Sequence, residues 1–165
     1  MTITSGPEFA TYWTGVRART RKVILCIPPA QLEWAPQRGR WTFGDIVRHL
    51  AGIERDMYGE NVQGQPSRYP GHDRGLADGF DAVLAFHDRK HEEANRIFAA
   101  LTPEQLQRRC PTPSGIEMST WKWLRAMVEH EAHHRGQLYL MLGMLGVATP
   151  PLYGLTEEEV RARAG

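Results

Sequence analysis

The spacing of apolar residues constrains the fold of this chain more than any other feature of its sequence. Three long segments carry inward-type residues at alternating steps of four and three, as expected for one face of helices that pack at a shallow angle. Sustained apolar and polar alternation with a period of two, which would indicate strands, does not occur. The sequence therefore predicts an all-α fold built as a helical bundle.

Capping residues, prolines and glycines set the ends of the expected helices. Ser5 and Glu8 have the spacing of a capping box, and Gly146 is placed to end the last long helix. The polar stretch 64–75, rich in glycine and proline, predicts a long irregular connection between the second and third helices. Short helices are expected at 103–108 and in the tail at 156–163. The long helices are expected at about 6–26, 42–62, 76–101 and 120–145.

Histidine occupies positions on these helical faces where a bundle normally places leucine or isoleucine. His130 and His134 are four residues apart, so one helix turns both imidazoles toward the same side. His49 lies on the inner face of the second helix and would add a third neutral nitrogen donor. Three protein ligands leave a coordination position open for water or substrate, which is typical of a catalytic metal site. We therefore expect a divalent metal ion bound by His49, His130 and His134.

Imidazole ligands suit several first-row metals, so the residues do not select one ion. We expect zinc or nickel, with iron and manganese as further candidates. Cys26 and Cys110 lie near helix or loop ends and are not expected to complete the site.

The other four histidines have less specific interpretations. His87 and His91 form a second pair four residues apart, and spacing alone leaves open whether either binds the metal or both form a pH-sensitive pair at the surface. Their highly charged neighbours favour the surface. His72 lies in the polar connection and is expected to be exposed. His133 is expected to flank the site or face water.

Two alternative functions are compatible with the same residues. The segment HEAHH, His130 to His134, fits the H-E-x-x-H pattern of zinc proteases, in which Glu131 would be the general base. The pattern is short, and no third histidine follows at the metzincin spacing. The other alternative is a metal-binding or ligand-binding bundle without turnover, whose coordination sphere would be closed by a residue such as Glu60, His87 or His91.

Composition and charge exclude several other classes of protein. The 20 lysines and arginines nearly balance the 19 aspartates and glutamates, so no strong field attracts nucleic acid or an anionic membrane. The first ten residues lack the basic and apolar regions of a signal peptide, and no later segment approaches the roughly 20 apolar residues that span a bilayer. Two cysteines are too few for a disulfide framework. We expect residues 1–165 to form a single cytoplasmic domain without nucleic-acid or membrane partners.

Two segments resemble the DinB/YfiT-like superfamily of metalloenzymes. They are WTFGDIVRHL, from Trp41 to Leu50, and HEAHHRGQLYLMLGMLG, from His130 to Gly146. The resemblance implies a four-helix bundle with a long connection between helices 2 and 3, a divalent metal held by the same three histidines, and often a homodimer. Some members of the superfamily use the metal to activate a low-molecular-weight thiol for S-transfer or isomerisation. The pair on the third helix departs from the family's pattern.

The expected function is that of a metal-dependent transferase or hydrolase acting on a small molecule. Its open three-histidine site would activate water or a low-molecular-weight thiol. Gln137, on the inner face, is expected to hydrogen-bond a metal ligand or the activated group, and Arg135 to pack against a neighbouring helix or form an ion pair. No catalytic residue is assigned beyond the three metal ligands.

Overall fold

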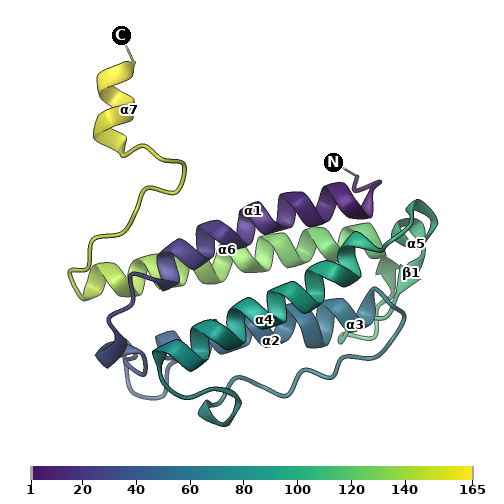
Figure 1. The fold of residues 1–165 in the computed structure, drawn as a ribbon, viewed down its shortest axis with the longest axis horizontal. Coiled ribbons are helices and arrows are strands. Elements are labelled where there is room, and N and C mark those ends of the chain that lie inside the picture. Colours follow the sequence, from purple (N-terminus) through teal and green to yellow (C-terminus); the bar gives the residue numbers. More distant parts are fainter. Residues whose placement is uncertain (1, 165) are drawn as a thin grey trace.

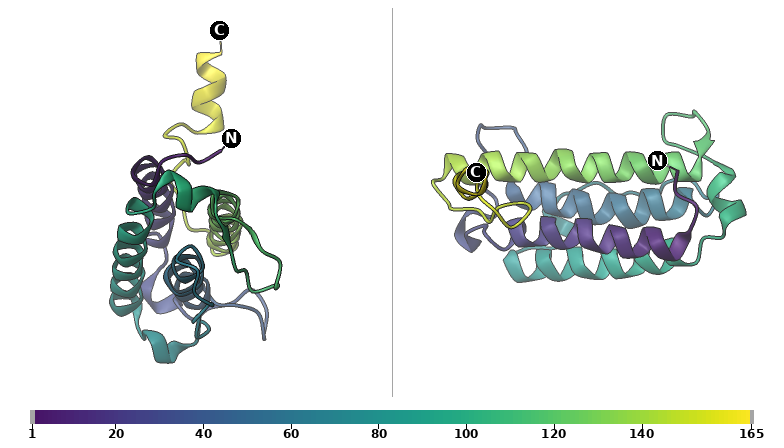
Figure 2. Two further views of the ribbon diagram at one scale, coloured as in Figure 1. Left: turned by 90° about the vertical axis from the view of Figure 1, so that its right-hand side faces the viewer. Right: turned by 90° about the horizontal axis from the view of Figure 1, so that it is seen from above.

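Four long helices form the body of the protein in a computed structural model, which describes residues 2–164 (Figure 1). They are α1 (Gly6–Ile24), α2 (Phe43–Ile53), α4 (Phe80–Ala99) and α6 (Thr120–Met144). Seen end-on in Figure 2, α1 and α2 lie diagonally opposite, and each packs against both α4 and α6. The predicted all-α bundle is confirmed. Within the described residues, no helix combines the length and the apolar composition needed to cross a membrane.

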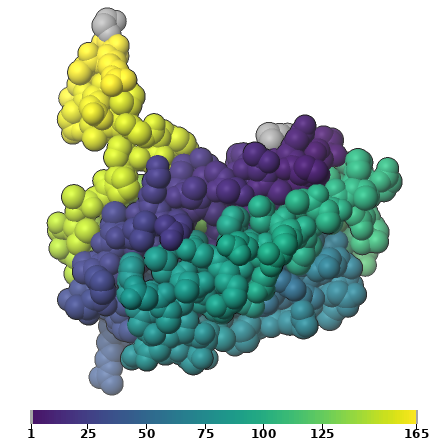
Figure 3. Space-filling model, in the orientation of Figure 1, coloured from purple at the N-terminus to yellow at the C-terminus, as the bar shows by residue number. Residues whose placement is uncertain are grey.

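Shorter elements connect and extend the four helices. A π-helical turn η2 (Glu54–Tyr58) and α3 (Gly59–Asn61) continue α2, and 3₁₀ turns form at η1 (Pro29–Gln31) and η3 (Arg74–Leu76). α5 (Pro103–Gln107) leads into an antiparallel pair of two-residue strands, β1 (Arg109–Cys110) and β2 (Met118–Ser119). The last helix, α7 (Glu157–Arg163), stands away from the bundle in Figures 1 and 3.

Local sequence sets most helix ends where the capping residues predict them. The Thr42 side chain accepts a hydrogen bond from the Asp45 backbone and the Asp45 carboxylate accepts one from Thr42, which completes a capping box at α2. Ser5 caps α1 by accepting from the Glu8 backbone, which is half of the predicted box. Gly146 follows α6 with a φ of 68°, a conformation that glycine adopts without strain.

Three local features differ from the sequence predictions. The expected helix 42–62 is interrupted by the π turn, which inserts about one extra residue into the helical repeat. The third helix begins at Phe80 rather than near 76, because residues 74–76 form a 3₁₀ turn and Gly79 has a φ of 83°. The strand pair was not predicted, since two residues are too few to show alternation.

The core consists of two apolar clusters at opposite ends of the bundle. One contains aromatic residues of α1 and α4, such as Phe9, Trp13 and Phe98, and the other is formed around Phe43 and Leu138. Between the clusters, every long helix contributes buried polar side chains at about the same height. This polar layer contains Arg17, Thr20, His49, Glu54, His87, Glu131, His134 and Arg135.

The buried face of α6 agrees only in part with the face that the sequence predicts. The predicted inner face contains Trp123, Met127, His130, His134, Gln137, Met141 and Leu145. Met127, His134 and Met141 are buried, but the other four residues are only half-buried. The buried face also includes Leu124, Glu131 and Leu138, which the prediction left out. It missed Glu131 because apolar periodicity assigns a glutamate to the surface, whereas Glu131 lies in the core.

Arg17 supplies a positive charge to two buried carboxylates in this layer. Its guanidinium lies 2.9 Å from a carboxylate oxygen of Glu131 and 3.1 Å from one of Glu54, and all three side chains are almost fully buried. Trp13 and His91 also hydrogen-bond to Glu54. Burial alone would raise the pKa of Glu54, but the positive charge of Arg17 and the contact with His91 hold that pKa below its ordinary value.

We expect Arg17→Met to lower the free energy of unfolding by about 3–5 kcal/mol, because it leaves two buried carboxylates without their counter-charge. Arg17→Lys, which keeps the charge, should cost less. Urea unfolding followed by circular dichroism measures both changes. The control is Arg125→Met, since Arg125 forms an exposed pair with Glu129 that should contribute less than about 1 kcal/mol. Equal losses for Arg17→Met and the control would contradict this account.

Candidate metal centre

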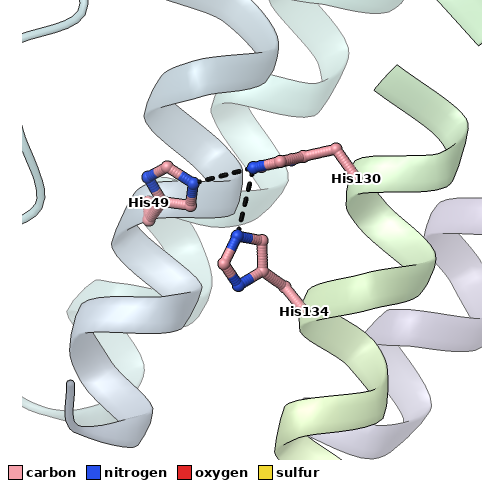
Figure 4. A group of neighbouring side chains, drawn as sticks. All are labelled: His49, His130 and His134. Carbon is pink, nitrogen blue, oxygen red and sulfur yellow. Dashed lines mark hydrogen bonds between the residues drawn. The ribbon is translucent and has the colours of Figure 1, made fainter. Parts of the chain in front are cut away.

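His49, His130 and His134 converge between α2 and α6. The Nε2 atom of His130 lies 3.0 Å from Nε2 of His49 and 3.1 Å from Nε2 of His134, and Figure 4 shows all three rings turned toward one point. His49 and His134 are buried and His130 is half-buried. These are the three histidines that the sequence predicts to converge, and within residues 2–164 they form the one cluster of suitable ligand atoms.

The position of His49 depends on the burial of α2 from almost every side. The helices α4 and α6 cover the inner faces of α2, and the connection between α3 and α4 covers the outer face of α2. Arg48 holds that connection by donating to the backbone carbonyls of His72 and Ala77, while its charge is paired with Glu33 and Asp45. The residue next to His49 thus fixes the loop that completes the site.

A second layer of hydrogen bonds orients two of the histidines. Nδ1 of His49 lies 2.7 Å from the Tyr69 hydroxyl, which also lies 3.2 Å from Nδ1 of His72. On α6, Nδ1 of His134 lies 2.7 Å from the side-chain carbonyl oxygen of Gln137. Tyr69 reaches His49 because its ring crosses Gly52, where an added Cβ would come within 3.1 Å of the ring.

These contacts leave nitrogen lone pairs facing the centre of the cluster. The Gln137 carbonyl oxygen only accepts, so His134 carries its proton on Nδ1 and directs the Nε2 lone pair inward. The Tyr69 hydroxyl can donate to His72 and accept from His49, which leaves His49 in the same state. Tetrahedral zinc sites separate nitrogen ligands by roughly 3.3 Å, given Zn–N bonds of about 2.0–2.1 Å. Two of the separations in the cluster, 3.0 and 3.1 Å, are close to this value, and all three ligand atoms lie within 4.8 Å of one another, so the donor set is compatible with a divalent cation.

Trp41 covers this cluster on the side of the loop that precedes α2. Its ring lies nearly parallel to that of His134, with centroids 5.6 Å apart, and 4.8 Å from the centroid of His49. It also lies 4.2 Å from the ring of His72. An aromatic wall therefore separates the nitrogen cluster from the surface at this point.

Burial keeps the clustered imidazoles neutral. Burial, together with a smaller contribution from neighbouring histidines, lowers the pKa of His49 to about 3 and that of His130 to about 4. Burial also lowers the pKa of His134, although its hydrogen bond to Gln137 opposes the shift. Neutral imidazole is the form that binds metals.

The remaining histidines lie at other places in the fold. His87, predicted at the surface or at the metal, is 1% exposed and bonds to Asp88, while His91 bonds to Glu54 in the polar layer. The surface interpretation of His87 was wrong because the charged neighbours point outward from a buried position. His72 is half-buried against Trp41 rather than exposed. His133 is exposed and flanks the cluster, as predicted.

The other side chains that the sequence singles out lie beside the cluster or away from it. Glu131 points to Arg17 in the polar layer, so its position does not suit a general base at the histidine cluster. Gln137 bonds to His134, and Arg135 packs on α1 beside Thr20. Sequence reasoning missed Tyr69, whose only signal was an aromatic residue within an otherwise polar connection. The free cysteines, Cys26 and Cys110, are outside the cluster.

The fold and the three-histidine site define a class of helical bundles, and comparison with known proteins identifies the family. The chain belongs to the DinB superfamily, whose family model matches residues 12–138. It is 25% identical over 159 residues to the uncharacterized protein YrdA of Bacillus subtilis (strain 168). This alignment covers 92% of the chain and 90% of YrdA.

Solved structures show the same fold at lower identity. YfiT from Bacillus subtilis, a probable metal-dependent hydrolase with an unusual four-helix bundle topology, superposes with a TM-score of 0.69 and 17% identity, covering 87% of this chain and 89% of YfiT. A mutant of the mycothiol-dependent maleylpyruvate isomerase gives a TM-score of 0.65 and 12% identity, covering 90% of this chain and 65% of the isomerase. These likenesses establish the four-helix bundle.

We expect His49 and His130 to stay neutral from about pH 5 to pH 8 in the metal-free protein. In the unfolded chain they would protonate near pH 6.5, so the unfolded state binds more protons and stability should fall below that pH. Each of the two histidines should lower the free energy of unfolding by up to about 1.4 kcal/mol per pH unit below that value. An NMR titration of the imidazole C–H resonances after chelator treatment measures the protonation midpoints of the two residues. A protonation midpoint of either residue between pH 6 and 7 would contradict it.

Proposed function

We propose that this DinB-superfamily protein is a metal-dependent enzyme in which His49, His130 and His134 bind a divalent cation. The convergence of three inward-facing Nε2 atoms carries the proposal. A cation held by three neutral imidazoles would lower the pKa of water or of a thiol at the site and so supply a nucleophile near neutral pH. Zinc and nickel are our first candidates, and iron and manganese are the next.

The residues around the cluster have roles that do not depend on the identity of the metal. Tyr69 and Gln137 fix the rings of His49 and His134 and hold their protons on Nδ1. Trp41 and the connection held by Arg48 limit the access of bulk water to the cluster. The low pKa values of the histidines keep the donors unprotonated in mildly acidic solution.

We expect metal uptake to depend on the three histidines together. Protein purified without a histidine tag, stripped with a chelator and dialysed against zinc, nickel or cobalt should bind roughly one ion per chain. His49→Ala, His130→Ala and His134→Ala should each lose most of this metal, as measured by elemental analysis. His133→Ala is the matched control, because His133 is exposed on the same helix. Unchanged metal content in His49→Ala with His130→Ala would overturn the proposal.

Two nucleophiles are compatible with the cluster, and each has one relative in its favour. The mycothiol-dependent isomerase supports a low-molecular-weight thiol, which we prefer, and YfiT supports water. The two reactions differ in their requirement for thiol.

We expect the metal-loaded protein to conjugate or isomerise activated small molecules only when a thiol is added. Glutathione, bacillithiol and mycothiol are the thiols to screen, with products followed by mass spectrometry and His49→Ala as the inactive control. Turnover of esters or amides at the same rate without thiol would instead assign the hydrolase reaction. Absence of turnover with a closed coordination sphere, seen in the cobalt spectrum, would favour a binding protein.

A further inference from the structure

A groove of about 620 Å³ lies between the loop that precedes α2 and the C-terminal half of α6. Figure 2 (right) shows this loop, in blue, beside the light green helix α6. The groove gathers three large apolar side chains that are exposed together, since Trp41 is 38%, Leu140 68% and Met144 57% exposed. Its volume is within the range of small-molecule pockets, and its wall favours an apolar ligand body.

The inner end of the groove is built from the side chains that touch the three-histidine cluster. Trp41 lines the groove with one part of its surface and packs against His134 and His49. Gln137 also lines the groove and hydrogen-bonds to His134. A ligand that lies along the groove would therefore end against Trp41 and Gln137, which contact the histidine cluster on their other side.

Arg40 places a positive charge at the rim of the groove. Of the described residues that line it, only Arg40 is charged, and its side chain is exposed. A turn positions the backbone of Arg40, whose N–H donates to the Gln37 carbonyl, with Gly39 at a φ of 78°. An arginine at the rim of an apolar groove is suited to bind a carboxylate.

We propose that this groove binds the organic substrate of the three-histidine site, and that this substrate is an aryl- or alkyl-substituted carboxylate. Its carboxylate pairs with Arg40, and its apolar body lies on Trp41, Leu140 and Met144. Low-molecular-weight thiols such as glutathione carry several polar groups, for which the groove offers little. The groove therefore suits the reaction partner of the thiol or water. The term substrate rests on the proposed function, whereas the binding preference does not.

Binding can be measured with 4-phenylbutanoate on the full chain, with and without metal. We expect its affinity, measured by calorimetry, to exceed that of 4-phenylbutylamine and that of butanoate by at least about tenfold. The amine carries a positive charge in place of the carboxylate, and butanoate lacks the apolar body. The ligand should shift the Trp41 indole N–H resonance in NMR spectra, identified by its absence in Trp41→Phe.

Surface variants separate this site from nonspecific binding. Arg40→Gln should weaken 4-phenylbutanoate by about tenfold, while Arg38→Gln, an exposed arginine outside the groove, should not. Leu140→Asp should weaken it further, whereas Leu25→Asp, at an exposed position after α1, should not. Equal effects of Arg40→Gln and Arg38→Gln would overturn the proposal, as would equal affinity for the acid and the amine. A dimer that Leu140→Asp dissociates would also overturn it, because a second copy would then cover the groove.

Metal content measured on the same samples distinguishes the two proposals. Selective acid binding by a protein that takes up no metal would support the groove and refute the proposed metal site. In cobalt-loaded protein, we expect paramagnetic broadening of the phenylbutanoate protons, because the groove ends at Trp41 and Gln137, which both contact His134. Selective binding without broadening would overturn the assignment of this ligand as a substrate analogue, while metal uptake would still support the site.

Discussion

The buried contact of Arg17 with Glu54 and Glu131 constrains the arrangement of the whole bundle. It joins α1 to the π turn after α2 and to the middle of α6, where all three side chains are almost fully buried. Successive residues of a helix point about 100° apart. With Glu131 turned toward α1, the side chains of His130 and His134 are therefore turned toward α2. One rotation of α6 about its axis therefore places Glu131 at Arg17 and the two histidines at His49.

The polar layer places charged and titratable side chains in the interior, where they interrupt the apolar core. The two apolar clusters at the ends supply the burial that stabilises the bundle. Between them, each buried polar group needs a partner or must stay neutral. Glu54 and Glu131 are paired with Arg17, while the pKa values of His49 and His130 are lowered, so those two imidazoles remain uncharged. The histidines can then act as ligands without opposing the fold by mutual repulsion.

Much of the fold could be predicted from the sequence, because capping residues and helical spacing are local signals. Thr42 with Asp45 and Gly146 mark helix ends as predicted. The three converging histidines could also be predicted, from their spacing and helical faces together with the resemblance to the DinB/YfiT-like superfamily. Spacing alone did not separate them from His87 and His91. The π turn could not, and neither could the core position of Glu131. The core position of Glu131 depends on Arg17, which is distant in sequence and supplies the charge that makes a buried carboxylate stable. Glu54, in the π turn, pairs with the same arginine.

The sequence by itself determined the helical class, the main helix ends and the identity of the three histidines that meet. Only the tertiary structure decided what surrounds them: Tyr69 behind His49, Trp41 over His134, and His87 buried in the polar layer instead of at the surface. The physical reason is the distance along the chain over which each interaction acts. Helix periodicity and capping act over a few residues. The burial of a polar side chain, in contrast, depends on partners from other elements that sequence spacing does not reveal.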